Sequence, residues 1–259
     1  IIDYLPTEYQ NKYNLVSKNN AIRDIHFATS LENISNAKKR LIYEELFEFS
    51  FKMNYLKKLN QKKLKNAKKF DEEKVSLLIN SLGFSLTEDQ KSSVNDILND
   101  LKSNKKMNRL LLGDVGSGKT IVATIGIYAN FLSGYQSSLM APTELLAYQH
   151  YYSINSILDK FGVTVELITG SMTKKEKEKI YERVKNNEID LLIGTHSLLN
   201  DNLIFNNLGL VITDEQHRFG VNQRFTLQDK STSPDILYLS ATPIPRTYAM
   251  TIYGDLDIS

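Results

Sequence analysis

Cysteine and tryptophan are absent from this chain of 259 residues, and histidine is scarce. Without cysteine, the chain can form neither a disulfide bond nor a thiolate metal site. The four histidines are scattered, at His26, His150, His196 and His217, so a histidine-rich zinc site is not expected. No apolar run approaches the roughly 20 residues that a membrane-spanning helix needs, and no signal peptide opens the chain. We therefore expect a cytoplasmic protein with no membrane partner.

Glycine is missing from about the first third of the chain, which has the pattern of helices. Within it, five apolar residues recur at spacings of three and four, which places them on one face of a helix: Ile42, Leu46, Phe49, Met53 and Leu56. We expect this stripe to make core contacts and not to form a ligand site.

The net charge of +2 says little about partners, because a global value hides local patches. One lysine run contains no acidic residue, and its members are Lys57, Lys58, Lys62, Lys63, Lys65, Lys68 and Lys69. Such runs are usually the solvated face of a helix, which is the favoured interpretation here. Contact with a DNA backbone is the alternative.

From about Leu110 the pattern changes to short apolar runs that alternate with helical stretches. Strands separated by helices predict parallel βαβ units, with helices on both faces of one sheet. Ligands bind such sheets at the carboxyl ends of the strands. The predicted helices begin near Thr87, Lys119, Glu144 and Thr173. The predicted strands are Arg109–Gly113, Ser137–Ala141, Thr164–Ile168, Asp190–Gly194, Gly209–Thr213 and Ile236–Ser240.

The most specific motif is GDVGSGKT at Gly113–Thr120, which matches G-x-x-x-x-G-K-[ST]. It lies between an apolar strand and a helix, the setting that a P-loop requires and a chance glycine-rich turn lacks. Its glycines let backbone N–H groups surround phosphate oxygens at the start of a helix. Lys119 is predicted to reach the β- and γ-phosphates of ATP, and the Thr120 hydroxyl to bind Mg²⁺. The full predicted nucleotide-binding set in the loop is Gly113, Gly116, Ser117, Gly118, Lys119 and Thr120.

An acidic pair, Asp214 and Glu215, follows the apolar run Leu210–Thr213. Beside a P-loop, Asp214 is predicted to hold magnesium, while Glu215 orients and deprotonates the attacking water. A lone pair of this kind is often a solvated turn, but the P-loop favours the catalytic interpretation. An acid that activates water favours hydrolysis over transfer to a second substrate.

Two weaker features favour a motor over a kinase or a signalling GTPase. Ser240 and Thr242 end another apolar run, which places hydroxyl side chains beside the nucleotide. Thr87 and Gln90 precede the P-loop strand, where the Gln90 amide could read the adenine edge. A threonine at a helix start is more often an N-cap, so the signal from Thr87 alone is weak.

These motifs resemble those of known helicases. The string DEQH at Asp214–His217 is a DExH-type box, and with Ser240–Thr242 it resembles a superfamily-two helicase. The strings GDVGSGKT, DEQHRFGV and ATPIPRT together resemble the bacterial RecG family of branched-DNA helicases. Gln216 and Ser117 favour this family over the transcription-repair coupling factor, and Gln216 favours it over the replication-restart helicase. Two stretches, Ile25–Phe27 and Ala37–Phe47, resemble the segment that links the wedge domain of that family to its motor.

The resemblance implies DNA contacts in three loops at strand ends. Their predicted contact residues are Thr143, Gly170, Ser171 and Thr195. Hydroxyls and backbone N–H groups in such loops suit phosphate contacts that do not read bases. Ordinary turn and capping chemistry is the alternative. His217 is expected to link the nucleotide site to Ser240 and Thr242 and not to bind metal.

The resemblance also implies a domain organisation. We expect a helical arm over residues 1–82 and a first RecA-like α/β domain with a flanked parallel sheet over residues 83–259. The chain opens on Ile1 and ends soon after its last motif, so we expect a fragment that lacks the wedge domain and the second motor domain. RecG-like motors close ATP between two RecA-like domains, and the second supplies arginines. Arg246 belongs to a motif of the first domain.

The implied function is an ATP-dependent DNA helicase that acts on forked or branched DNA in recombination and repair. We expect the whole protein to be monomeric and nucleoid-associated in a bacterial cytoplasm, and this piece to hydrolyse ATP poorly alone. A nucleotide- and DNA-binding module without turnover is one alternative. A translocase coupled to RNA polymerase is another.

Overall fold

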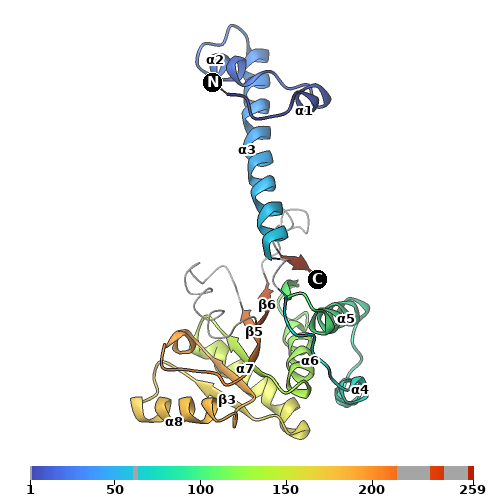
Figure 1. Cartoon of the computed structure of the whole chain (residues 1–259), viewed down its shortest axis with the longest axis vertical. Coiled ribbons are helices and arrows are strands. Elements are labelled where there is room, and N and C mark those ends of the chain that lie inside the picture. Colours follow the sequence, from blue (N-terminus) through green and yellow to red (C-terminus); the bar gives the residue numbers. More distant parts are fainter. Residues whose placement is uncertain (1, 61–63, 215–233, 242–255) are drawn as a thin grey trace.

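A computed structural model of the chain describes residues 2–60, 64–214, 234–241 and 256–259. An α/β body forms one end of the molecule, and the long helix α3 (Leu31–Asn60) extends away from it (Figure 1). The short helices α1 (Thr7–Lys12) and α2 (Lys18–His26) lie beside the far end of α3. Within these ranges, no helix has the length and apolar character needed to cross a membrane.

The described strands form one sheet in the order β3-β4-β2-β5-β6-β1-β7, and all neighbouring strands are parallel. This confirms the predicted parallel α/β architecture, and the six predicted strands agree with the structure to within one residue at each end. The short seventh strand was not predicted. The strands are β1 (Asn108–Leu112), β2 (Gln136–Met140), β3 (Val165–Ile168), β4 (Leu191–Gly194), β5 (Leu208–Asp214), β6 (Asp235–Ser240) and β7 (Asp257–Ile258).

Helices cover both faces of this sheet, because alternate side chains of each strand point to opposite faces. On β5, Leu210 and Ile212 join the larger core under helices α4 to α7, whereas Val211 joins a second core under α8. The helices are α4 (Glu72–Ser81), α5 (Glu88–Lys102), α6 (Lys119–Leu132), α7 (Glu144–Leu158) and α8 (Lys174–Lys185). The division at residues 82 and 83 stays a prediction, although α4 shares the larger core with the sheet.

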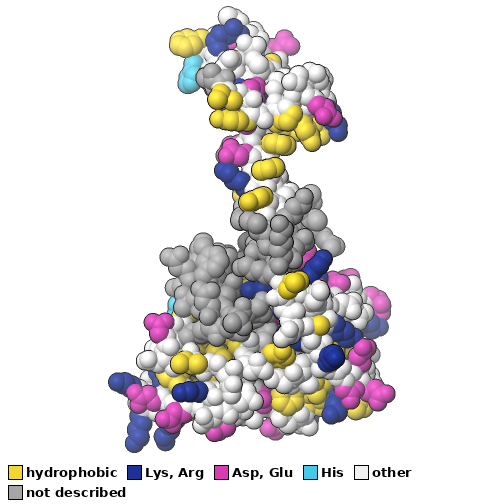
Figure 2. Space-filling model, viewed as in Figure 1, with side chains coloured by type: hydrophobic (Ala, Val, Ile, Leu, Met, Phe, Trp, Pro, Cys, Tyr) yellow, Lys and Arg dark blue, Asp and Glu magenta, His cyan; other side chains and the backbone are white. Residues whose placement is uncertain are grey.

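The arm packs differently from the prediction. Ile42 and Leu46 are 56% and 54% exposed, so these two members of the predicted stripe do not lie in a core here, whereas Phe49 is half-buried. The side chains of Met53 and Leu56 lie outside the described residues. The face of α3 that contacts α1 is one residue further on, where Tyr43 and Phe47 meet the rings of Tyr13 and Tyr9. Figure 2 shows apolar side chains on the surface of this part of the molecule.

A buried arginine explains this offset. Arg40 is fully buried and forms ion pairs with Asp3 and Glu44, and Glu44 also pairs with Lys18. A buried guanidinium must face its carboxylates, because an unpaired buried charge is costly. The rotation of α3 is therefore set by this polar cluster, which the apolar spacing alone does not reveal.

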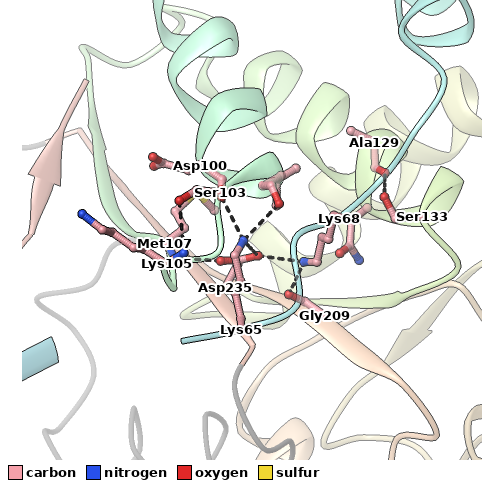
Figure 3. Close-up of polar contacts among 12 residues, drawn as sticks. Lys65, Lys68, Asp100, Ser103, Lys105, Met107, Ala129, Ser133, Gly209 and Asp235 are labelled. Atoms are coloured by element: carbon pink, nitrogen blue, oxygen red, sulfur yellow. Dashed lines mark hydrogen bonds and ion pairs between the residues drawn. The ribbon is translucent and has the colours of Figure 1, made fainter. Parts of the chain in front are cut away.

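Part of the lysine run is buried. Lys65 and Lys68 follow α3 in an extended segment, and both ammonium groups bind Oδ2 of Asp235, at 2.6 and 2.8 Å. Lys68 also donates to the Gly209 carbonyl, and the backbone N–H of Met107 donates to Oδ1 of Asp235 (Figure 3). We call this set the lysine anchor. It joins the segment after α3 to the amino ends of β5 and β6.

Both interpretations of the run were wrong for Lys65 and Lys68, which form no solvated helix face and are not accessible to DNA. The reason is a distant partner, because Asp235 is fully buried and needs positive charge beside it. Lys69 is exposed, as predicted, but it lies between α3 and α4 and not on a helix face. Lys62 and Lys63 and the side chains of Lys57 and Lys58 lie outside the described residues.

The charge on Lys68 makes stability depend on pH. Burial lowers the pKa of Lys68 from 10.5 to about 8, although the Asp235 carboxylate acts in the opposite direction. Between about pH 8 and 10.5 the unfolded chain therefore binds more protons at this position than the folded chain, so the free energy of unfolding rises with pH. We expect the unmodified chain to gain up to about 3 kcal/mol across this window relative to Lys68→Met. Urea unfolding at several pH values measures this difference.

A second variant for comparison is Asp235→Asn. It leaves two buried lysines without their carboxylate, so we expect it to lower the free energy of unfolding at pH 7 by about 3–5 kcal/mol. Lys68→Met retains the Lys65–Asp235 pair and should cost much less. Parallel pH profiles for Lys68→Met and the unmodified chain would contradict the assigned burial of the Lys68 charge.

Candidate nucleotide-binding site

The predicted P-loop lies between β1 and α6, as expected. Gly116 and Gly118 have φ values of 81° and 84°, which a residue with a Cβ rarely adopts. Gly113 packs closely under the loop, where an added Cβ would lie 2.5 Å from Oγ of Ser117. Because α6 begins at Lys119, the N–H groups of its first turn point toward the loop. This arrangement suits an anion such as a phosphate.

The Lys119 ammonium lies over the loop. Its Nζ donates to the carbonyl of Gly113 at 2.6 Å and to the carbonyl of Asp114 at 2.9 Å. These bonds hold the positive charge at the loop, where the β- and γ-phosphates of a nucleotide are expected. The side chain of Asp114, in contrast, is exposed.

Gln90 braces the P-loop. Thr87 is the N-cap of α5, and Oε1 of Gln90 accepts from the Thr87 N–H in a capping box. On its other side, Nε2 of Gln90 donates to the carbonyl of Ser117 at 2.8 Å, and it lies so close to Gly118 that an added Cβ would approach to 2.5 Å. The N-cap interpretation of Thr87 is therefore confirmed. In this structure the Gln90 amide is bonded to protein on both sides, and adenine reading by it stays a prediction.

Asp214 and Ser240 lie at the same edge as the P-loop. Asp214 ends β5 and Ser240 ends β6, and β6 lies between β5 and β1 in the sheet. The Ser240 carbonyl accepts from the N–H of Gly113 at 3.2 Å, which ties β6 directly to the loop. The sheet therefore brings together three elements that are far apart in sequence.

The donor chemistry at this edge fits magnesium. Thr120 offers a hydroxyl and Asp214 a carboxylate, both hard oxygen donors. Magnesium in nucleotide sites is typically held by one or two such groups, with phosphate oxygens and water completing its shell. Thr120 and Asp214 therefore remain the predicted ligands.

A residue without a predicted role also lies at this site. His150, on α7, places Nε2 2.8 Å from Oδ2 of Asp214, and both side chains are largely buried. The sequence contains no motif that would single out this histidine. Its only signal is its position on the buried face of a helix between Ala147 and Ile154.

Three of the four predicted DNA-contact residues lie close together. Thr143 is the N-cap of α7 and accepts from the Leu146 N–H, so it has the capping role that was the alternative. The neighbouring Glu144 accepts from both the N–H and the Oγ of Ser171, at 3.1 Å each. Thr143, Gly170 and Ser171 are exposed. They therefore form one surface cluster that DNA could reach.

The fourth, Thr195, is only 7% exposed, so its hydroxyl is the least accessible of the four. It precedes the 3₁₀ helix η2 (His196–Leu199), whose Leu198 N–H bonds to its carbonyl. The predicted residues Glu215, His217 and Thr242, together with Arg246, lie outside the described residues.

A substitution of Gln90 distinguishes support of the P-loop from recognition of adenine. Gln90→Glu keeps the oxygen that bonds Thr87 but replaces the donor to Ser117 with an acceptor. Loss of one hydrogen bond is worth about 1–1.5 kcal/mol, so we expect affinities for fluorescent ATP and GTP analogues to fall equally, by roughly 5–10-fold. Ser92→Ala, on the exposed side of α5, is the control. A loss confined to the ATP analogue would instead establish adenine reading.

Comparison with known proteins gives consistent matches. Residues 87–251 match the family model described as DEAD/DEAH box helicase. Over 258 residues the chain is 44% identical to the ATP-dependent DNA helicase RecG of Bacillus subtilis, a match that covers 99% of this chain and 38% of that protein. The protein of the same name from Borreliella burgdorferi is 44% identical over 255 residues, with 98% and 37% covered. The chain therefore spans well under half the length of these relatives.

Among solved structures, that of RecG bound to a three-way DNA junction matches with a TM-score of 0.85 and 42% identity, over 100% of this chain and 35% of that chain. The UvsW helicase from bacteriophage T4 matches with a TM-score of 0.54 and 16% identity, over 75% and 69%, which shows likeness of fold alone. These matches confirm the predicted RecA-like helicase fold. Because the family model matches more than half of the residues of this chain, the chain belongs to the DEAD/DEAH box helicase family.

Proposed function

We propose that this chain is the ATP-binding first motor domain of a RecG-type DNA helicase, which remodels branched DNA such as stalled forks and Holliday junctions. The observation that carries the proposal is the meeting of the P-loop, Asp214 and Ser240 at one edge of the sheet. The similarity to RecG over nearly the whole chain supports the choice of DNA as the substrate of the motor.

Each residue of the site has a proposed task. The N–H groups of the P-loop and the Lys119 ammonium bind the β- and γ-phosphates, and Thr120 and Asp214 hold magnesium. Magnesium, when bound, neutralises charge that develops on the phosphates. Glu215, directly after β5, orients and deprotonates the attacking water. Ser240 and Thr242 then couple the nucleotide state to the rest of the motor through His217.

The site is proposed to be incomplete without a second RecA-like domain. An arginine from such a domain stabilises charge in the transition state, and its contribution can reach about 10³–10⁵ in rate. We therefore infer that this chain hydrolyses ATP slowly on its own. The relatives are much longer than this chain, which leaves room for such a domain in the whole protein.

DNA is proposed to bind at the cluster of Thr143, Gly170 and Ser171. Exposed hydroxyls and loop N–H groups are the groups that contact phosphates without reading sequence. That mode of binding suits a motor that must move along any DNA. In this structure the N–H and hydroxyl of Ser171 donate to Glu144, so the proposal requires them to exchange that partner for a phosphate. The solved RecG structure contains a three-way DNA junction, which supports branched DNA as the substrate class.

A substitution at the P-loop tests this proposal. In the intact protein, Lys119→Ala removes the charge that binds the phosphates, so we expect DNA-stimulated ATP hydrolysis to fall at least about 100-fold. Lys160→Ala, an exposed lysine outside every predicted site, is the matched control. Unchanged DNA-stimulated hydrolysis in Lys119→Ala would rule out the proposed ATP site.

The choice between branched-DNA remodelling and coupling to RNA polymerase needs a separate readout. Preferential unwinding of forked DNA over linear duplex by the intact protein supports the proposal. Specific retention of RNA polymerase by the intact protein, without preference for junctions, would favour the polymerase-coupled translocase.

A further inference from the structure

The contact between His150 and Asp214 joins the buried face of α7 to the nucleotide site. His150 lies on the buried face of α7, in line with the apolar residues Ala147, Ile154 and Leu158. A polar ring on such a face is costly unless it is hydrogen-bonded. The partner it finds is the carboxylate that ends β5 at the nucleotide site, 64 residues away in sequence.

The bond restrains that carboxylate. An ionised carboxylate can only accept hydrogen bonds, so Nε2 of His150 is the donor. With Oδ2 held at 2.8 Å, rotation of the Asp214 carboxylate is limited, and the direction in which it presents its oxygens is set. Groups that hydrogen-bond to metal ligands in this way typically change metal affinity or activity by about 10–100-fold.

The same helix also reaches the predicted DNA surface. In the first turn of α7, Glu144 accepts two hydrogen bonds from Ser171 and lies close to Gly170, where an added Cβ would approach its Oε1 to 3.0 Å. His150 is six residues further along the same helix, about 9 Å at the usual rise. The Glu144–Ser171 contact and the group that holds Asp214 therefore lie on one continuous helix.

We propose that His150 is a positioning residue for ATP hydrolysis, which orients Asp214 and, through α7, makes that orientation respond to DNA at the Thr143, Gly170 and Ser171 cluster. This inference rests on the proposed function. It assigns DNA stimulation of the ATPase to a physical link within one domain: DNA contacts shift the start of α7, and His150 transmits the shift to the magnesium ligand.

The first test separates orientation of Asp214 from folding. In the intact protein, binding of a fluorescent ATP analogue is titrated against Mg²⁺ for His150→Leu, His150→Gln and the exposed neighbour control Gln149→Leu. We expect His150→Leu to raise the Mg²⁺ concentration at half-saturation by about 10–100-fold, while binding without Mg²⁺ is retained. His150→Gln, whose amide nitrogen can replace Nε2, should restore most of the loss. Gln149→Leu should behave as the unmodified protein.

The second test addresses the link through α7. The ratio of ATP hydrolysis with and without forked DNA is measured at saturating Mg²⁺ for Glu144→Ala, for His150→Leu and for the double variant. Both single variants should lower this ratio severalfold. If α7 carries the effect, the double variant should lose little more than the worse single one, because the two residues act in series.

The outcomes distinguish this inference from the proposed function. An unchanged Mg²⁺ dependence in His150→Leu, while Lys119→Ala abolishes hydrolysis, would overturn the role of His150 and leave the ATP site intact. Independent, multiplicative losses in the double variant would overturn the link to DNA. If His150→Leu does not fold, His150→Asn replaces it. Its amide is too short to reach Asp214, so a normal Mg²⁺ dependence there would equally overturn the inference.

Discussion

The parallel direction of β1, β5 and β6 is the constraint on which the rest of the structure depends. Because the three strands run the same way, the P-loop, Asp214 and Ser240 must meet at one edge. Their opposite ends hold the lysine anchor, where Asp235 begins β6 and Gly209 lies near the start of β5 (Figure 3). The segment that follows α3 is thus attached to the same strands that carry the nucleotide site. The nucleotide site and the lysine anchor therefore lie at opposite ends of the same, largely buried strands.

Much of the fold could be predicted because its signals are local. Short apolar runs marked six strands to within one residue, and the glycines of GDVGSGKT marked a loop whose positive φ angles the structure confirms. The placement of Asp214 at the same edge followed from parallel topology alone. These features depend on periodicity and turn chemistry, which are contained in a few consecutive residues.

The rest depended on partners distant in sequence. Lysines in a run predict a charged surface, yet Lys65 and Lys68 are buried because Asp235, more than 160 residues away, needs them. The predicted contact face of α3 was wrong by one position, because the buried Arg40 side chain forms an ion pair with Asp3. The His150–Asp214 bond likewise joins two elements whose proximity only the folded sheet creates. In each case a buried polar group is paired with a residue from a distant part of the chain, and no short sequence pattern predicts such a pairing.

We have proposed that this chain holds one half of an ATPase site. ATP hydrolysis by the purified chain, with and without forked DNA, tests it most directly, with Glu215→Gln as the reference and circular dichroism to verify folding. We expect near-background hydrolysis by a folded chain under both conditions. A robust, DNA-stimulated rate that Glu215→Gln abolishes would contradict it, because the chain would then complete its own site.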